Sequence, residues 1–155
     1  MEFSTTINGR THRVSVRPNQ TLLEFLRDDL KLKGSVEGCG NGVCGSCTVL
    51  LDGKPVSSCL TLASNLEDKR LITIEGLAQN GHLDAIQQAF IDHQAFQCGF
   101  CTSGMIMAVK GLLNAHPRPT EQLVREYLSG NLCRCGTYAE VLAVVRDLAR
   151  RDTNE

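Results

Sequence analysis

The sequence predicts an α+β protein whose first half holds short strands with one helix and whose second half holds four helices. Three observations predict this. Strand-like runs in the first half are joined by Asn-Gly and Asp-Gly turn signals. Four helical stretches follow, and the cysteines divide into four in each half. We therefore expect two small domains, residues 1–75 and residues 76–155, with the boundary in the segment 76–81.

The first half is expected to begin with a hairpin, because two strand-like runs flank Asn8-Gly9. Thr21 and Glu24 form a capping box that opens a helix reaching Leu30. A glycine-rich loop occupies residues 34–45, and Asp52-Gly53 turns a second hairpin. The predicted strands are Glu2–Ile7, Thr11–Val16, Thr48–Leu51 and Pro55–Ser58, and an apolar run over Leu71–Ile74 closes this half.

The second half is expected to be a small helical bundle. Pro117 and Pro119 separate its second and third helices. Thr137 precedes the last helix and Glu140 lies three residues later, which predicts a second capping box. The predicted helices are Leu83–His93, Ser103–Asn114, Glu121–Leu128 and Tyr138–Arg150.

Composition excludes several classes of function. With 16 Lys+Arg against 17 Asp+Glu, the formal net charge of −1 gives no electrostatic reason to expect nucleic acid as a partner. No apolar run approaches about 18 residues, so no membrane span is expected. The first residues lack the basic and apolar regions of an export signal, and the eight cysteines in 155 residues are sparse for a disulfide scaffold. We expect a cytoplasmic protein that uses thiolates as metal ligands.

The first cysteine group has the spacing C-x4-C-x2-C with a fourth cysteine after eleven more residues. That is the plant-type spacing of a [2Fe–2S] cluster. Three thiolates on one tight loop must converge on a small inorganic core, and the four glycines of the segment 38–45 give its backbone the freedom to bend. A structural zinc site is the weaker alternative, because zinc sites prefer separated cysteine pairs. The expected ligands are Cys39, Cys44, Cys47 and Cys59.

The second cysteine group combines a C-x2-C pair with a C-x-C pair 31 residues later. Each pair directly precedes a predicted helix, whose N-terminal N–H groups stabilise anionic thiolates. This spacing alone leaves zinc open as an alternative to an iron–sulfur cluster. The expected ligands are Cys98, Cys101, Cys133 and Cys135.

The segments GCGNGVCGSCT (38–48), QCGFCTSGM (97–105) and GNLCRC (130–135) resemble the small iron–sulfur subunit of the molybdenum hydroxylases, the xanthine oxidase/aldehyde oxidoreductase family. The resemblance covers nearly the whole chain. It implies a plant-type ferredoxin (β-grasp) domain followed by a four-helix domain, each holding one [2Fe–2S] cluster. Three positions depart from the family pattern: Ser46 replaces Ala, Ser103 replaces Pro, and Gly136-Thr137 reverses the commoner order.

The resemblance also implies partners and a route. A large molybdopterin-binding subunit hydroxylates an N-heteroaromatic or aldehyde substrate. Electrons pass to the cluster of the helical domain, then to the N-terminal cluster, and on to a medium FAD-binding subunit or another acceptor, within a heterotrimer or a dimer of heterotrimers. By resemblance, Gln97 lies against the pterin cofactor. This chain is then the non-catalytic electron-transfer subunit of the oxidoreductase.

Two other functions remain possible from the residues. A free-standing ferredoxin would shuttle electrons by diffusion, although such carriers are often strongly acidic and need no second group of four cysteines. A protein-interaction domain stabilised by structural zinc would have no redox activity. Iron and acid-labile sulfide content distinguishes clusters from zinc, and co-purification with molybdenum and flavin subunits distinguishes a relay subunit from a free ferredoxin.

Overall fold

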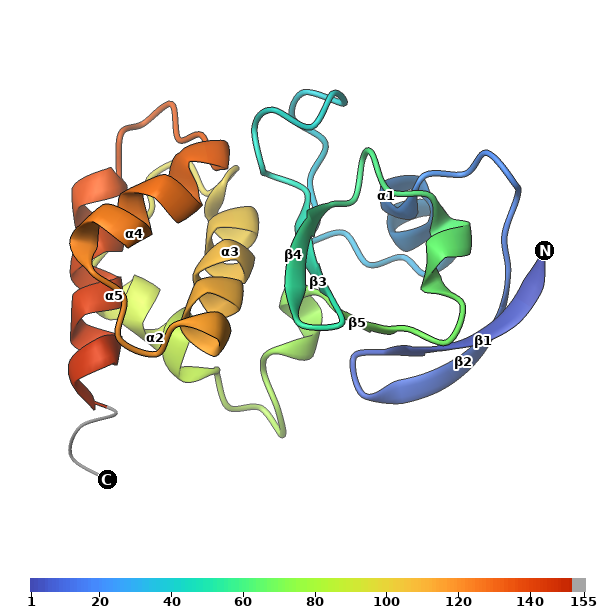
Figure 1. Cartoon of the computed structure of the whole chain (residues 1–155), viewed down its shortest axis with the longest axis horizontal. Coiled ribbons are helices and arrows are strands. Elements are labelled where there is room, and N and C mark those ends of the chain that lie inside the picture. The colour runs from blue at the N-terminus through green and yellow to red at the C-terminus, as the bar shows by residue number, and fades with distance from the viewer. Residues whose placement is uncertain (152–155) are drawn as a thin grey trace.

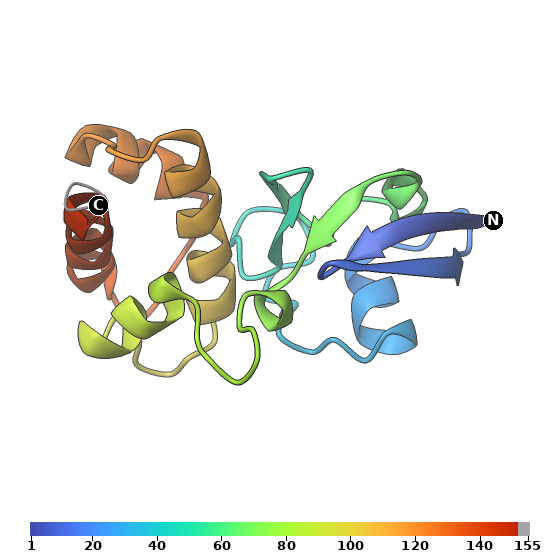
Figure 2. The ribbon, with the colours of Figure 1, turned by 90° about the horizontal axis from the view of Figure 1, so that it is seen from below.

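The computed structural model describes residues 1–151, in which a sheet-containing half and a helical half lie side by side (Figure 1). The view from below in Figure 2 places the N-terminus at the far end of the sheet half and the last described helix at the far end of the helical half. The expected second domain extends to residue 155, and its residues 152–155 lie outside the described part.

The first half is built on a five-stranded mixed sheet with the strand order β2-β1-β5-β3-β4. Only the central β1–β5 pair is parallel; the other neighbours are antiparallel. Both predicted hairpins are confirmed, and their Asn-Gly and Asp-Gly turns have positive φ angles at both residues. The strands are β1 (Glu2–Ile7), β2 (Arg10–Ser15), β3 (Thr48–Leu51), β4 (Lys54–Ser57) and β5 (Arg70–Ile72).

The predicted helix over residues 21–30 differs from expectation in its internal geometry. The capping box of Thr21 and Glu24 is present, but α1 (Leu22–Glu24) widens at once into a π-helical segment, η1 (Phe25–Asp29). The amide of Leu30 donates to the carbonyl of Phe25, five residues earlier, at 3.1 Å. The apolar stripe of this helix still reaches the core between it and the sheet. Short 3₁₀ segments that the sequence did not predict are η2 (Ala63–Leu66) and η3 (Ile74–Gly76), the latter ending the predicted Leu71–Ile74 run.

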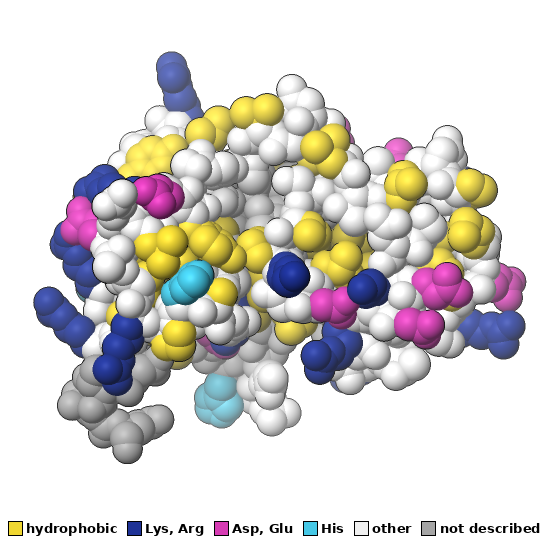
Figure 3. All heavy atoms as spheres, viewed as in Figure 1, with side chains coloured by type: hydrophobic (Ala, Val, Ile, Leu, Met, Phe, Trp, Pro, Cys, Tyr) yellow, Lys and Arg dark blue, Asp and Glu magenta, His cyan; other side chains and the backbone are white. Residues whose placement is uncertain are grey.

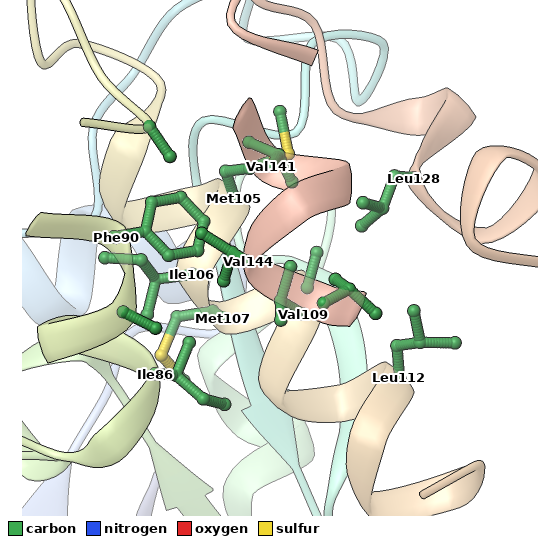
Figure 4. Packing of buried hydrophobic residues seen from close by; sticks show 14 of the residues in the cluster. Ile86, Phe90, Met105, Ile106, Met107, Val109, Leu112, Leu128, Val141 and Val144 are labelled. Carbon is green, nitrogen blue, oxygen red and sulfur yellow. The ribbon is translucent and has the colours of Figure 1, made fainter. Parts of the chain in front are cut away.

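The four predicted helices of the second half are confirmed to within two residues at each end. They are α2 (Ala85–Asp92), α3 (Thr102–Ala115), α4 (Glu121–Tyr127) and α5 (Tyr138–Arg151), and a 3₁₀ turn, η4 (Leu128–Gly130), follows α4. Figure 4 shows their buried side chains converging, with Phe90 from α2, Met105 and Val109 from α3, and Val144 from α5. Residues 1–151 contain no helix both long and apolar enough to cross a membrane.

Helix α3 joins the two halves, because it packs on β3 and β4 and also on the other helices. Leu50 of β3 belongs to the same apolar cluster as the helical core. Gly104 at the start of α3 allows a very close approach: a Cβ there would lie 2.2 Å from the carbonyl oxygen of Gly45. The start of α3 therefore rests directly on the backbone of the glycine-rich loop.

Candidate functional site: two groups of thiols on one edge

The first cysteine group lies on the glycine-rich loop and at the end of β4. Cys39 is exposed, Cys44 is half-buried, and Cys47 and Cys59 are buried. Three glycines of this loop, Gly40, Gly42 and Gly45, have positive φ angles, as the sequence analysis expected from the sharp bends. The backbone N–H of Cys44 points at the Sγ of Cys39, 3.4 Å away. N–H groups aimed at sulfur favour the thiolate form that a metal requires.

The four thiols of this group interact in two pairs. Backbone N–H groups of Asn41 and Cys44, together with contact with the Cys44 thiol, lower the pKa of Cys39 to about 6. Burial and contact with the Cys47 thiol raise the pKa of Cys59 to about 11. One pair therefore includes the exposed Cys39, whose pKa is lowered, whereas the other pair is buried beside Leu23.

The second cysteine group is formed by the loop before α3 and the loop before α5. Cys98 is exposed, Cys101 and Cys135 are half-buried, and Cys133 is buried. The backbone N–H of Phe100 and contact with the Cys135 thiol lower the pKa of Cys98. Burial and contact with the Cys133 thiol raise the pKa of Cys101 to about 12. The pairs here are Cys98 with Cys135 and Cys101 with Cys133.

Thr137 supports the buried thiol of this second group. Its hydroxyl oxygen lies 3.2 Å from the Sγ of Cys133. Burial opposes ionisation of Cys133, but hydrogen bonds from the hydroxyl and the backbone N–H of Thr137 outweigh it and lower the pKa of the thiol to about 7. The capping box expected for Thr137 and Glu140 stays a prediction, and the contact that the structure shows for the Thr137 hydroxyl is with the sulfur of Cys133.

The pairing of thiols fits a two-iron core. Within residues 1–151 no three metal-ligating side chains converge as they would on a single ion. A [2Fe–2S] core instead takes two thiolates on each of its two irons. Each group offers two contacting thiol pairs, together with backbone N–H groups directed at sulfur. The residues present therefore fit one such cluster in each half.

The two groups of thiols lie beside each other across the interface between the halves. The backbone N–H of Leu132, next to Cys133, donates to the carbonyl oxygen of Cys44 at 2.9 Å. A surface hollow of about 490 Å³ lies between the groups and is lined by Cys39, Cys98 and Phe100 among others. Figure 1 shows both cysteine-bearing segments at the same edge of the molecule, uppermost in that view.

Asn131 forms hydrogen bonds across this interface. The sequence did not predict this role. Its buried side-chain N–H groups face the carbonyl oxygen of Gly45 at 3.1 Å, the hydroxyl of Thr48 at 3.3 Å and the carbonyl oxygen of Gly104 at 3.4 Å. These acceptors belong to the first cysteine loop, to β3 and to α3. The position of Asn131 directly before Leu-Cys-Arg-Cys was the available signal, but nothing local indicated its partners.

Gln97 lies at the exposed edge of the second group. Its side-chain amide approaches the carbonyl oxygen of Cys135 at 3.5 Å. The neighbouring apolar side chains Phe96, Phe100 and Leu132 are exposed by 41%, 51% and 48%. Exposed hydrophobic side chains are visible along the upper edge of Figure 3, where Figure 1 shows the cysteine-bearing segments. These three apolar side chains are therefore exposed on or beside the loops that carry the second cysteine group.

Comparison with known proteins matches both halves to iron–sulfur families. Residues 5–78 match the model of the 2Fe-2S iron-sulfur cluster binding domain, and residues 73–146 match the model of the [2Fe-2S] binding domain. The nicotine 6-hydroxylase small subunit of Paenarthrobacter nicotinovorans is 47% identical, with 95% of this chain and 88% of that protein covered. The nicotinate dehydrogenase small FeS subunit of Eubacterium barkeri is 42% identical, with 98% and 97% covered.

Solved structures give the same result. Quinoline 2-oxidoreductase from Pseudomonas putida 86 contains a chain with a TM-score of 0.90 and 45% identity, covering 97% of this chain and 96% of that one. The aldehyde oxidoreductase from Desulfovibrio gigas has a TM-score of 0.94 and 35% identity, covering 99% of this chain and 17% of that much longer one.

The fold and the two groups of thiols define an electron-transfer protein with two [2Fe–2S]-binding domains. The chain belongs to the family of small iron–sulfur subunits of the molybdenum hydroxylases, the xanthine oxidase/aldehyde oxidoreductase family. It is a subunit of an oxidoreductase complex, and its role in that complex is electron transfer.

Proposed function

We propose that eight thiols of this chain hold the two clusters, four in each half. The first cluster is held by Cys39, Cys44, Cys47 and Cys59, and the second by Cys98, Cys101, Cys133 and Cys135. The contacting thiol pairs and the N–H groups aimed at Cys39 and Cys98 support this ligand set. When bound, each cluster supplies a centre that accepts and releases one electron at a time.

We further propose that residues 1–75 and 76–155 are two domains that form one relay. The single observation that carries this is the hydrogen bond from Leu132 N–H to Cys44 O, 2.9 Å long. This bond joins Leu132, the neighbour of Cys133 in the second group, to Cys44 in the first group. The chain thus provides a short bonded route between two centres that otherwise belong to separate folding units.

The direction of the relay is the one that the family resemblance implies, and the exposed side chains beside each group are where the partners would bind. Gln97, Phe96 and Phe100 lie within two residues of the exposed Cys98 in the sequence and are themselves exposed. We propose that they contact a large molybdopterin-binding subunit, with Gln97 against the pterin. Val43 and Leu60, exposed by 59% and 64%, flank the first group and would contact a medium FAD-binding subunit. The assembly would be a heterotrimer or a dimer of heterotrimers.

The names of the relatives support a substrate class for the complex. Two of the most similar relatives are subunits of enzymes named for nicotine and nicotinate, and a similar solved structure is an oxidoreductase named for quinoline. We propose that the complex hydroxylates an N-heteroaromatic compound in a pocket of the large subunit. Eight cysteines without disulfides suit a reducing compartment, so we propose a cytoplasmic location.

The experiment is to purify the complex with its neighbouring subunits and to measure iron, acid-labile sulfide, molybdenum and flavin. We expect four irons and four sulfides for each copy of this chain. In a Cys44→Ser variant, substrate should still reduce the second cluster, whereas flavin reduction should slow by at least tenfold. In Cys135→Ser, no cluster of this chain should become reduced on substrate addition.

Ser46→Ala is the matched control in the same loop, because it introduces the residue that the family pattern carries there and removes no thiol. It should keep both clusters and the wild-type rate of flavin reduction. Flavin reduction at the wild-type rate in Cys44→Ser would contradict the route. A wild-type complex without iron and sulfide would contradict the function itself.

A further inference from the structure

The hydroxyl of Thr137 is positioned toward a single sulfur atom. Thr137 is 3% exposed and Cys133 is 8% exposed, and Thr137 Oγ1 lies 3.2 Å from Cys133 Sγ. Gly136, with a φ angle of +85°, turns the chain between the last cysteine and α5, and this turn brings Thr137 back over Cys133. The backbone N–H groups of Gly136 and Thr137 face the same thiol.

The direction of this hydrogen bond follows from the chemistry of the ligand. A cysteine bound to iron is a thiolate, which has no proton to donate. The hydroxyl of Thr137 must therefore be the donor and Cys133 Sγ the acceptor. Hydrogen bonds to ionised acceptors are stronger than those between neutral groups, so the bond strengthens as negative charge on the sulfur increases.

One-electron reduction adds negative charge to the cluster and its thiolates: one Fe³⁺ becomes Fe²⁺, and no bond is broken. A donor that binds the more negative state more tightly favours that state. Hydrogen bonds to sulfur are among the factors that set the potentials of such clusters. The buried position of Thr137 matters here, because water does not compete well for a buried donor.

We propose that the Thr137 hydroxyl raises the reduction potential of the cluster held by Cys133 and its partners. The inference rests on the proposed function, because it requires Cys133 to be a cluster ligand. It extends that function by assigning a role to the Gly136-Thr137 order. With the hydroxyl in place, the second cluster is a better acceptor for the electron that leaves the large subunit.

A second hydroxyl near the same group offers a matched control. Ser103 follows Cys101 by two residues, but its Oγ donates to the carbonyl oxygen of Gly34 at 2.6 Å. Its hydroxyl is thus occupied by backbone and not by sulfur. Ser103→Ala removes a hydroxyl close to the second group without removing a donor to a ligand.

The test is an EPR-monitored redox titration of the purified complex, with dithionite as the electron donor and the two clusters followed separately. In Thr137→Val, which keeps the shape and loses the hydroxyl, the equilibrium constant for reducing the second cluster should fall about tenfold. For a one-electron couple this equals about 59 mV. Thr137→Ser should keep the wild-type potential, as should Ser103→Ala, and the first cluster should be unchanged in all variants.

The outcomes separate the inference from the proposed function. An unchanged potential in a cluster-loaded Thr137→Val complex would overturn the inference and leave the proposed function standing. A shift in Thr137→Ser as large as that in the Val variant would also overturn it, because the hydroxyl would then not be the cause. If the Val variant does not load its clusters, Thr137→Ala repeats the measurement without added bulk. A wild-type complex that lacks the second cluster would contradict the proposed function first.

Discussion

Replacing Asn131 tests whether the interface between the halves depends on one buried amide. The amide nitrogen carries two hydrogens and faces three oxygen atoms, at 3.1, 3.3 and 3.4 Å. Asn131→Ala removes about two hydrogen bonds, each worth about 0.5–1.5 kcal/mol, so we expect the free energy of unfolding to fall by about 2 kcal/mol. For a chain of this size the melting temperature should fall by about 4–8 °C.

Asn131→Asp is the sharper perturbation, because it has nearly the same shape as Asn but turns the donor into an acceptor. A carboxylate facing carbonyl oxygens without a donor costs more than an empty position. We expect Asn131→Asp to be less stable than Asn131→Ala by at least about 1 kcal/mol. A mere loss of volume would give the opposite order.

The assay is calorimetric unfolding of the cluster-loaded chain, with the magnetic interaction between the two reduced clusters measured by EPR as a second readout. Asn114→Ala and Asn114→Asp serve as controls, because Asn114 is exposed near the end of α3. They should stay close to the wild-type melting temperature. An Asp variant at position 131 as stable as the Ala variant would refute the reasoning, as would an unchanged magnetic interaction in both.

Three further predictions test the packing and the charges. Gly104→Ala places a methyl 2.2 Å from the carbonyl oxygen of Gly45. Overpacking of this kind costs about 1–3 kcal/mol, so calorimetry should give a lower melting temperature. Gly130→Ala is the control and should keep the wild-type melting temperature, because no atom lies within 4 Å of the added Cβ. Leu112 is 0% exposed, so Leu112→Ala should lower the free energy of unfolding, measured in urea, by about 2–5 kcal/mol. An effect as small as that of a surface substitution would contradict the packing. Arg146 and, to a smaller extent, Arg125 lower the pKa of Glu121. The Glu121 carboxylate therefore stabilises the fold at pH values above its ordinary pKa of about 4.3. This stabilisation is lost as the pH falls through the lowered pKa. The melting-temperature deficit of Glu121→Gln should therefore be present at pH 7 and shrink toward pH 4; a constant deficit would count against the ion pairs.

Most of the fold could be predicted from the sequence because its signals are local. The turn pairs Asn8-Gly9 and Asp52-Gly53 and the Thr21–Glu24 capping box each act within four residues, and each is present. The widening of the helix at Phe25–Asp29 could not be predicted, because a helix with this stripe of leucines suits α and π geometry alike. Tertiary contacts decide between the two.

The candidate site, like the fold, has features that depend on the local sequence and features that depend on tertiary packing. Cysteine spacing predicted both groups of candidate ligands, but the pairing of Cys98 with Cys135 and of Cys101 with Cys133 depends on how α3 and α5 pack. The sequence predicted a cap of α5 for the Thr137 hydroxyl, but it did not predict that this hydroxyl faces Cys133. The contact could not be predicted, because a hydroxyl at a helix start can serve either the helix or a neighbouring acceptor, and only the tertiary fold brings that sulfur near.

With the domains and cluster ligands proposed above, the interface between the halves would keep the two redox centres at a fixed separation. Electron transfer weakens steeply with distance, so a relay needs an interface that does not slide. Here the joining contacts engage backbone atoms: Leu132 N–H to Cys44 O, the Asn131 amide to Gly45 O, and Ser103 Oγ to Gly34 O. Each of the three contacts ends on a backbone carbonyl oxygen, and α3 packs so closely on the loop at Gly104 that it cannot move nearer to it. With the cluster ligands proposed above, the contacts that hold the halves together would also fix the path between the two centres, so a change at Asn131 should alter stability and electron transfer together.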